Sequence, residues 1–336
     1  MVATGVNRLM RSALVVGGTS YIGRAIVETF LAAGYDVTSL SRGNHDAGVD
    51  ADERLTRLTG DRTEAATIER AAEAADPDVV VDNAAYSPAD VETAVEVFGD
   101  ADAYVYVSSV GAYDHDRILK YERDTPLEPC SAEQATDDSF GTYPNRKAEG
   151  DRLVFEAAER GVAAMSVRPT MVYGPHNHLP FLQYWIDRAV SEDRIVVPGD
   201  GSYVAHRTYV EDVASAIRTV AEDGRPGEAY NVADRQPLSV DGTLDLVCEV
   251  ADTEVERVYA SPRELADADL SPAEFPLFMG DPFVMATDKL SALGWESTPA
   301  ATAMERTIDY HREAGLSEYD AGPSRAAERR LLDDLA

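Results

Sequence analysis

The most informative stretch of this 336-residue chain reads GGTSYIG, residues 17–23. It follows the short apolar run Ala13–Val16, which is typical of a buried strand, and it opens a helical pattern that ends before Gly34. Glycine lets the backbone approach phosphates closely, and a helix N-terminus offers free N–H groups and the positive end of its dipole. This context predicts a site for a dinucleotide pyrophosphate, formed by Gly17, Thr19, Ser20, Tyr21, Ile22 and Gly23.

Strand-like and helix-like segments then alternate along the chain. Further strands are predicted at Val37–Leu40, Val79–Val81, Ala103–Val107, Val162–Val167, Ile195–Val197 and Glu228–Val232. Helices are predicted at Thr63–Ala75, Pro88–Phe98, Tyr143–Arg160, Leu179–Val190, Tyr209–Ala221 and Ser324–Ala336. This order predicts an α/β protein of the Rossmann type with a doubly wound parallel sheet and a smaller C-terminal α/β lobe.

The pattern also suggests domain limits. Residues 11–175 form the expected nucleotide-binding Rossmann domain, to which residues 205–235 return. Residues 176–312 are expected to form mainly the substrate-binding lobe, and residues 313–336 a charged C-terminal helix or tail. The extension before Met10 is expected to be loose, and Met10 is an alternative start.

The residues after the second predicted strand bear on the choice of cofactor. NAD-selective sites usually place a carboxylate there to hold the ribose hydroxyl, whereas this chain reads Ser41-Arg42-Gly43. Arg42 is suited to a 2′-phosphate, which favours NADP over NAD, although a solvated loop arginine remains the alternative. Further residues expected along the dinucleotide groove are Asp61, Arg62, Asn83, Ala84 and Ala85, followed by Val107 and Ser108 after the fourth strand.

Tyr143 and Lys147 lie four residues apart, on one face of a predicted helix. A tyrosine is a poor base at neutral pH, but an adjacent ammonium is expected to lower its pKa, so that it can exchange a proton while hydride moves. Ser109 follows a strand end, where parallel sheets present catalytic groups, and its hydroxyl can bond the substrate oxygen. Ser109, Tyr143 and Lys147 are therefore the predicted catalytic set of an oxidoreductase.

The chain is strongly acidic, with 61 acidic against 30 basic residues and a formal net charge of −31. Acidic residues spread over a chain with a normal apolar fraction indicate a surface adapted to high salt, where screening removes self-repulsion. This favours a halophile, such as an archaeon that stores KCl, as the source. The same charge makes nucleic acid an unlikely partner, because binding it requires a basic surface.

Cys130 and Cys248 match no metal spacing and are interpreted as ordinary thiols of a reducing cytosol. No stretch is long and apolar enough for a membrane span or a signal peptide, so a cytoplasmic protein without a membrane partner is expected. His176 and His178 have no carboxylate cluster beside them, and no metal is expected.

Taken together, these residues resemble the extended, atypical short-chain dehydrogenase/reductase family of the NAD-dependent epimerase/dehydratase type. The resemblance covers roughly residues 12–312. It is carried by GGTSYIG at 17–23, YVSSVGAY at 106–113, YPNRK at 143–147, RPTMVYGP at 168–175, PGDGSYVAHRTYVEDVA at 198–214 and YNVAD at 230–234.

The resemblance implies an NAD(P)-dependent enzyme of sugar metabolism. It places Arg168, Pro169 and Val172 at the cofactor, and Tyr86, Val110 and Tyr173 at the substrate. His176, His206 and Arg207 are further candidates for substrate contact. The family also implies a homodimer paired through the helix at 88–98 and the Tyr143 helix.

Three positions depart from the family pattern. Ser20 replaces the middle glycine of GxxGxxG. Val110 and Gly111 stand where sugar-nucleotide dehydratases carry an Asp-Glu pair, so 4,6-dehydration is not expected. Ala205 occupies the position of an arginine that grips a nucleotide-sugar diphosphate, with His206 and Arg207 beside it as candidates to compensate.

Several functions stay open at this point. The leading hypothesis is a dehydrogenase or reductase that acts on a small polar alcohol or carbonyl compound, either a sugar or a nucleotide sugar. The alternative is a nucleotide-sugar epimerase with retained NAD. A hypothesis of another class is a non-catalytic family member that binds NADP(H) or RNA.

Overall fold

The structure is a computed structural model, and it describes residues 11–43, 48–49, 52–177, 179, 181–278, 280–314 and 321–335. The expectations for Met10 and His178, and parts of the expected C-terminal tail, lie outside these residues.

A seven-stranded parallel sheet forms the larger lobe, as predicted. Its strand order is β11-β7-β5-β4-β1-β2-β3. The strands are β1 (Ser12–Val16), β2 (Asp36–Ser41), β3 (Leu55–Thr59), β4 (Val79–Asp82), β5 (Ala103–Val107), β7 (Ala164–Pro169) and β11 (Ala229–Val232). Because β1 is central, the loop after it opens at the crevice where doubly wound sheets bind their ligands.

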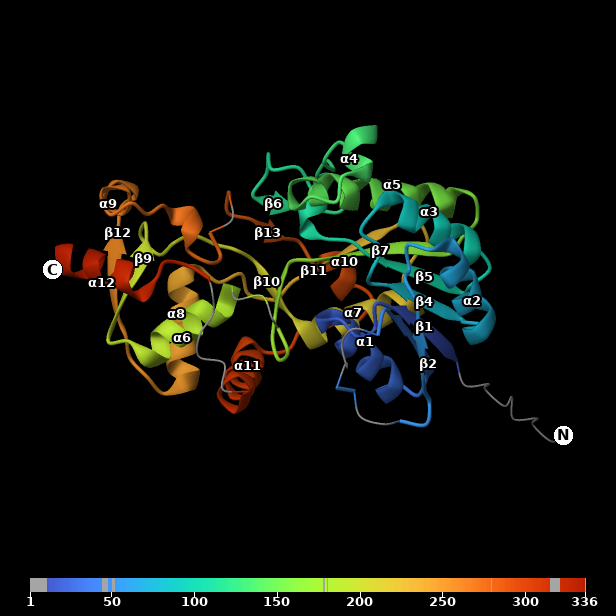
Figure 1. Ribbon diagram of the computed structural model, residues 1–336, viewed down its shortest axis with the longest axis horizontal. Coiled ribbons are helices and arrows are strands. Elements are labelled where there is room, and N and C mark those ends of the chain that lie inside the picture. The colour runs from blue at the N-terminus through green and yellow to red at the C-terminus, as the bar shows by residue number, and fades with distance from the viewer. Residues whose placement is uncertain are drawn as a thin grey trace.

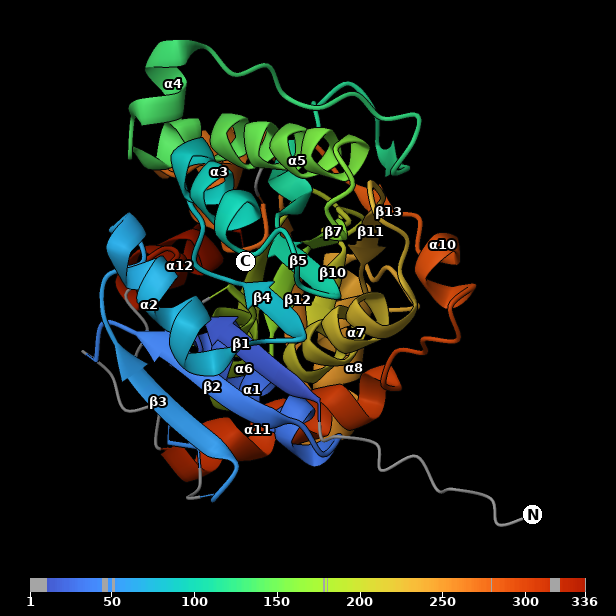
Figure 2. The ribbon, with the colours of Figure 1, turned by 90° about the vertical axis from the view of Figure 1, so that its right-hand side faces the viewer.

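Helices cover both faces of this sheet (Figure 2). One face packs against α1 (Tyr21–Ala32) and α7 (Val210–Asp223), and the other against α2 (Ala65–Ala75), α3 (Pro88–Val97) and α5 (Tyr143–Glu159). Alternate residues of β1 divide between the two cores, with Val15 on the α1 side and Leu14 on the α2 side. A strand buried on both faces reads as a continuous apolar run, which explains the pattern of β1.

The second lobe lies at the opposite end of the molecule from β2 (Figure 1). Short parallel pairs join β8 (Met171–Tyr173) to β10 (Arg207–Tyr209), β9 (Arg194–Pro198) to β12 (Glu256–Ala260) and β6 (Leu119–Lys120) to β13 (Val284–Met285). The remaining helices are α4 (Ala132–Thr136), α6 (Phe181–Ser191), α8 (Val240–Ala251), α9 (Pro262–Asp267), α10 (Asp288–Ser291), α11 (Ala300–Ala314) and α12 (Arg325–Asp334). Short 3₁₀ turns occur at Val110–Ala112, Phe140–Thr142 and Pro272–Glu274.

The C-terminal helix α12 is anchored to the second lobe. Glu328 is buried, and it accepts hydrogen bonds from the Tyr184 hydroxyl at 2.7 Å and the Arg188 guanidinium at 2.6 Å. Leu331 and Leu332 are also buried. The helix is thus part of the packed lobe and not a detached tail.

Strand β3 was absent from the prediction. Its five residues, LTRLT, are half-buried or exposed, as expected of a strand at the sheet edge. Without an apolar run or a clear alternation, an edge strand leaves little signal in the sequence. Helix α2 also begins two residues later than predicted, at Ala65.

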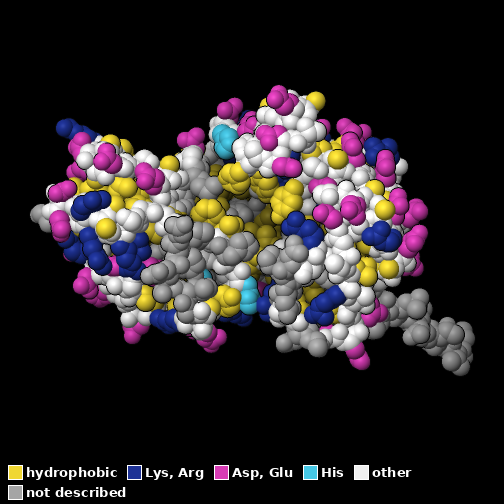
Figure 3. Space-filling model, in the orientation of Figure 1, with side chains coloured by type: hydrophobic (Ala, Val, Ile, Leu, Met, Phe, Trp, Pro, Cys, Tyr) yellow, Lys and Arg dark blue, Asp and Glu magenta, His cyan; other side chains and the backbone are white. Residues whose placement is uncertain are grey.

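Acidic side chains are spread over the face of the molecule shown in Figure 3. Within the described ranges, no helix combines the length and apolar character that crossing a membrane would need.

Candidate functional site

A cavity of about 440 Å³ opens between the two lobes, and Figure 3 shows this hollow with largely apolar walls. Both lobes contribute to it, the larger through loops at the carboxyl ends of its strands. Twelve residues that were predicted for the site line the cavity: Tyr21, Ile22, Asn83, Tyr86, Val107, Ser108, Ser109, Val110, Tyr143, Lys147, Pro169 and Val172. The structure therefore brings together residues spread over 150 positions of the chain.

The glycine-rich turn lies at one end of this cavity. A Cβ at Gly23 would lie 2.0 Å from the Gly17 carbonyl oxygen, and Gly17 itself has φ +85°. Both positions therefore require glycine. Because the loop lies this close to the helix, the N-terminus of α1 stays open to a ligand. Its free N–H groups suit the pyrophosphate of a dinucleotide.

Ser20, which replaces a family glycine, has a defined structural role. Its hydroxyl donates to the Gly17 carbonyl at 2.8 Å and accepts from the Gly23 N–H at 3.2 Å, so it caps α1. It also accepts a hydrogen bond from the Asn83 amide at 2.7 Å. The serine thus ties the turn to the loop after β4 and preserves the turn without the glycine.

Lys147 is almost fully buried beneath the cavity. Its ammonium donates to the carbonyls of Ala85 at 2.8 Å and Val107 at 2.7 Å, and it lies 5.1 Å from the ring centre of Tyr86. Burial lowers the pKa of Lys147 to about 8. A cation held in this way keeps a fixed position next to the ring of Tyr143, whose centre is 5.8 Å away.

Tyr143 lies in the same wall, stacked on Phe140 at a centroid distance of 6.2 Å. Burial raises the pKa of Tyr143 to about 12, while a hydrogen bond with the Ser109 side chain and the charge of Arg146 lower it. The expectation that Lys147 lowers this pKa is therefore wrong for the structure as it stands. The loss of hydration around the phenol outweighs the nearby charges, and the Lys147 ammonium is engaged by two carbonyls.

Two buried hydroxyls in the cavity wall have no hydrogen-bond partner among the described residues. They are Ser108 Oγ and Thr170 Oγ1. Buried polar atoms are nearly always paired, so these two are available to a polar group of a ligand. They lie in the same wall as Lys147 and Pro169, which fits the carboxamide end of a nicotinamide.

Arg62 and Arg168 were predicted at the cofactor, but both guanidinium groups lie in buried ion pairs. Arg62 pairs with Asp82 and with Asp90, the latter at 3.1 Å. Arg168 donates to Asp151 at 2.8 Å and to the Tyr113 hydroxyl at 2.7 Å. Neither lines the cavity, so their side chains support the sheet from which the site is built.

The histidines and arginine expected at the substrate also face elsewhere. His206 accepts from the Met285 N–H at 3.0 Å and donates to the Asp234 carbonyl at 2.7 Å, and burial lowers its pKa to about 4. Arg207 donates to the Thr243 hydroxyl at 2.8 Å. Both side chains are buried and absent from the cavity lining, so they do not take the place of the family arginine missing at Ala205.

Tyr173 and His176 lie outside the cavity lining as well. Tyr173 is buried, and hydrogen-bonds with Asp234. His176 contacts Arg24 at 3.2 Å and packs at a tilt against Tyr310, with ring centres 4.4 Å apart. These contacts hold the segment after β8 against α1 and α11.

The residues after β2 and β3 lie at the outer end of the groove. Arg42 is exposed. Hydrogen bonds from Thr63 lower the pKa of Asp61, and the charge of Arg42 lowers it further. Arg42 and Asp61 are therefore neighbours beyond the strand ends, where the adenosine half of a dinucleotide would lie.

Sequence reasoning missed much of the cavity. The unpredicted lining residues are Gly111, Tyr113, His115, Arg117, Lys120, Phe140, Pro144, Thr170, Met171, Leu179, Phe181, Asp281, Pro282 and Phe283. Thr170 and Met171 lie within the quoted RPTMVYGP motif and could have been included. The residues of the second lobe had no motif to reveal them.

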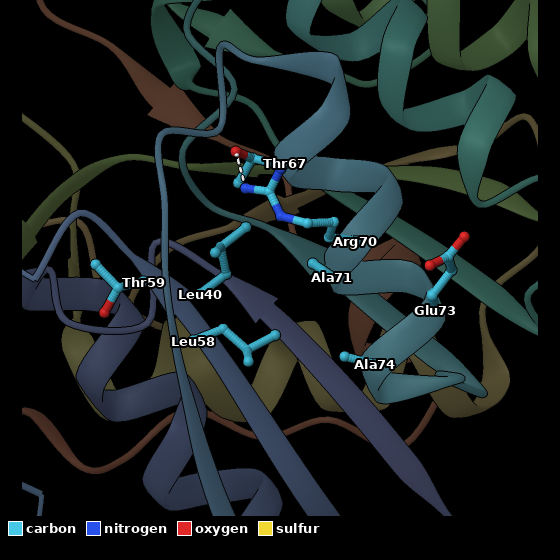
Figure 4. A pocket seen from close by; sticks show the side chains of 8 residues that line it. All are labelled: Leu40, Leu58, Thr59, Thr67, Arg70, Ala71, Glu73 and Ala74. Carbon is cyan, nitrogen blue, oxygen red and sulfur yellow. Dashed lines mark hydrogen bonds between the residues drawn. The ribbon is translucent and has the colours of Figure 1, made fainter.

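A second cavity of about 500 Å³ lies between α2 and strands β2 and β3 (Figure 4). The Arg70 guanidinium donates there to the Thr67 hydroxyl at 2.9 Å. None of the predicted cofactor or substrate residues lines it. Across the described part of the chain, no cluster of three or more His, Cys, Asp or Glu residues is arranged to hold a metal ion.

The sheet, the glycine turn and the tyrosine–lysine pair define a dinucleotide-binding α/β protein. Comparison with known proteins makes this specific: residues 13–233 match the family model of the NAD dependent epimerase/dehydratase family, and the chain belongs to that family. Its members are NAD-dependent enzymes.

Three similar proteins illustrate the range of the family. A chloroplast stem-loop binding protein of 41 kDa from Arabidopsis thaliana is 26% identical, over 84% of this chain and 74% of the relative. A dTDP-glucose 4,6-dehydratase from Xanthomonas campestris pv. campestris is 27% identical, over 90% and 93%. The crystal structure of a dTDP-glucose 4,6-dehydratase from Bacillus anthracis in complex with NAD superposes with a TM-score of 0.71 at 18% identity, covering 91% and 97%.

Proposed function

We propose that this protein is an NAD(P)-dependent dehydrogenase or reductase that acts on an alcohol or carbonyl carbon of a small compound. The observation that carries the proposal is the convergence of Ser109, Tyr143 and Lys147 in one cavity, next to the glycine-rich turn. The unpartnered hydroxyls of Ser108 and Thr170 add a place for the carboxamide of the cofactor.

Each of the three residues has a distinct role in this proposal. The dinucleotide supplies or takes up the hydride. Ser109 holds the substrate oxygen, and Tyr143 exchanges a proton with that oxygen. Lys147, fixed by the carbonyls of Ala85 and Val107, places a positive charge beside the tyrosine and is available to the nicotinamide ribose. The phenol of Tyr143 has a pKa of about 12, so it carries its proton at neutral pH and suits the role of proton donor in carbonyl reduction. A substrate that binds with its oxygen at Ser109 also changes the surroundings of this phenol.

The names of the relatives point to nucleotide sugars as a second candidate class. Two observations argue against nucleotide sugars. Ala205 has no group that could bind a diphosphate, and the side chains of His206 and Arg207 are hydrogen-bonded to Asp234 and Thr243 and not to the cavity. Val110 and Gly111 stand in the cavity wall after Ser109, and neither can serve as the acid or base of a dehydratase. A non-catalytic RNA-binding role is not favoured, because the formal net charge is −31 and the tyrosine–lysine pair is intact.

The nucleotide carried by the protein separates an exchanging dehydrogenase from an epimerase. The protein is purified in molar KCl and denatured, and any released nucleotide is identified by chromatography. We expect an empty protein that then binds NADPH more tightly than NADH. Stoichiometric NAD would instead indicate a retained cofactor and an epimerase cycle.

Arg42→Ala tests the preference for NADP. Losing a charged hydrogen bond to the 2′-phosphate is expected to raise the Kd for NADPH by about ten-fold or more, corresponding to roughly 1.5–3 kcal/mol. The Kd for NADH is expected to stay within about two-fold, because NADH lacks that phosphate. Fluorescence titration with both nucleotides measures the effect, and equal losses for both would contradict it.

The pH dependence of carbonyl reduction tests the role of Lys147. Because its pKa is lowered to about 8, Lys147 is charged below that pH and neutral above it. We expect kcat/KM to fall as the pH rises through about 8, and Lys147→Arg to remove this alkaline limb, since a guanidinium stays protonated. An identical limb in the variant would assign the titration to another group.

We also propose a homodimer. Helices α3 and α5 pack side by side on one face of the sheet, and Val97, Leu153 and Phe155 on them are only partly buried. Light scattering in about 2 M KCl, where charge repulsion is screened, should give twice the chain mass of 36.4 kDa. The mass of a single chain would contradict the pairing.

A further inference from the structure

The cavity changes character away from the dinucleotide turn. Beyond Ser109 and Tyr143, its described walls carry the apolar side chains of Phe140, Pro144, Met171, Leu179, Phe181 and Phe283. They come from both lobes and face one hollow, whose apolar surface is visible in Figure 3. Phe140 and Leu179 are exposed large apolar side chains, which are costly to leave in water unless a ligand or partner covers them.

The second lobe supplies an apolar wall at Ala205 and Phe283. Ala205 is buried and forms an isolated bridge with Phe283, and Phe283 lines the cavity. The neighbouring His206 points away from it, with both ring nitrogens engaged. The side chains of Ala205 and Phe283 therefore offer apolar contact surface, and the charged lining residue closest to Phe283 in sequence is the exposed Asp281.

The cations that line the cavity lie beside this wall, because β6, which ends at Lys120, pairs with β13, which begins directly after Phe283. Arg117 and His115 are exposed, on the loop that precedes β6. The Lys120 ammonium is already bonded to the Asp114 carbonyl. The reacting end itself thus contains no charged group that would hold a phosphate, apart from Lys147 beneath the tyrosine.

A sugar carries a hydroxyl on nearly every carbon, and each one that leaves water without a partner costs free energy. The polar groups at the reacting end are Ser109 and Tyr143, while Ser108, Thr170 and Lys147 are those expected at the nicotinamide. An apolar skeleton, in contrast, gains free energy from the same walls. The lining thus disfavours a substrate with many hydroxyl groups and favours one with an apolar skeleton next to a single oxygen.

We propose that the substrate is a secondary alcohol or ketone whose skeleton beyond the reacting carbon is alicyclic or aromatic. This rests on the proposed hydride transfer and narrows its substrate class. In the oxidative direction, Tyr143 first loses its phenolic proton to solvent; the carbinol C–H then leaves as hydride to the oxidised dinucleotide and the hydroxyl proton passes to the phenolate, giving the ketone, the reduced dinucleotide and the one proton already released. Phe283 is the residue that sets the apolar preference.

Four alcohols test the proposal on the purified full-length protein in molar KCl. They are 1-phenylethanol, cyclohexanol, glucose and UDP-glucose, each with NADP⁺ and NAD⁺, followed through the absorbance of the reduced nicotinamide. We expect kcat/KM for one of the apolar alcohols to exceed that of both sugars by at least about ten-fold. A preference for either sugar would overturn the inference while leaving the proposed hydride transfer intact.

The variant Phe283→Ser tests whether the preference for apolar alcohols arises from this wall of the cavity. It is expected to raise KM for the apolar alcohol by about ten-fold or more while kcat stays within about two-fold, since lost apolar contact weakens binding. Tyr259→Ser, at an exposed aromatic residue of β12 outside the cavity, is the matched control and should change neither. An unchanged KM in Phe283→Ser would overturn the role of this wall.

If none of the four alcohols is oxidised, the binding of a ketone tests the proposed apolar site. Acetophenone is then titrated into the protein loaded with NADPH, and nicotinamide fluorescence is followed. Saturable binding that Phe283→Ser weakens by about ten-fold supports the apolar site. Loading with NADPH but no binding of acetophenone overturns it, and failure to bind any dinucleotide overturns the proposed function itself.

Discussion

Tyr143→Phe is expected to lower kcat by about 10²–10⁴-fold, because positioned proton transfer contributes roughly that factor to catalysis. The substitution removes only the hydroxyl that hydrogen-bonds with Ser109 and keeps the ring that stacks on Phe140. Substrate KM and dinucleotide Kd are therefore expected to stay within about two-fold of the parent values. Steady-state kinetics together with nucleotide titration separate the two effects.

Tyr259→Phe provides the control for this change. It removes a tyrosine hydroxyl at an exposed position of β12, where the side chain donates to Asp241 at 2.9 Å. Its kcat should equal that of the parent protein. If Tyr143→Phe also kept full turnover, the assignment of Tyr143 as proton donor would be lost, and a protein that merely senses NADP(H) would fit better.

Asp151→Asn is expected to lower the free energy of unfolding by about 3–5 kcal/mol. Asp151 is fully buried and accepts from the Arg168 guanidinium at 2.8 Å and from the Ser166 hydroxyl. Burial opposes the charge of Arg168, yet Asp151 and Tyr113 raise its pKa above the usual arginine value. The asparagine keeps the volume but leaves a buried guanidinium without its counter-charge.

Arg218→Ala is the matched control for the buried pair. Arg218 pairs with Glu222 one turn along α7, at 2.8 Å and near the surface. Such pairs contribute about 0–1 kcal/mol, so chemical denaturation should show little change. A small loss in Asp151→Asn as well would mean that the Arg168 network is not a main support of the sheet.

The fold was predictable because its strands are buried on both faces. Residues 13–16 and 103–107 read as continuous apolar runs, and the first run is followed by a glycine turn and a helical pattern. Strand β3 was not predictable, because its half-exposed residues at the sheet edge follow neither pattern.

The catalytic set was predictable for a similar geometric reason. Tyr143 and Lys147 share a helix face by their spacing, and Ser109 follows a strand whose carboxyl end must open at the crevice. The direction of other side chains was not predictable. Arg168 and His206 lie within recognisable motifs and Arg62 follows Asp61, but buried partners distant in sequence turn all three away from the cavity.

The remaining cavity residues that the sequence did not predict lie largely in the second lobe. Phe181 and Phe283 are separated by about a hundred residues of short elements, yet they line the same cavity. Their proximity depends on small two-stranded pairings such as β6–β13, which leave weak signals in a single sequence. Substrate preference is therefore the property that the sequence revealed least.

The most direct test of the proposed hydride transfer is deuterium transfer. NADPH deuterated at the reactive carbon of its nicotinamide, as each of the two stereoisomers in turn, is incubated with the protein and a mixture of ketones and keto sugars. Mass spectrometry then searches for an alcohol with one deuterium bound to carbon. We expect such a product with one stereoisomer, and its loss in Tyr143→Phe. A protein that binds NADPH tightly but transfers deuterium to no carbonyl compound from either stereoisomer would contradict the account.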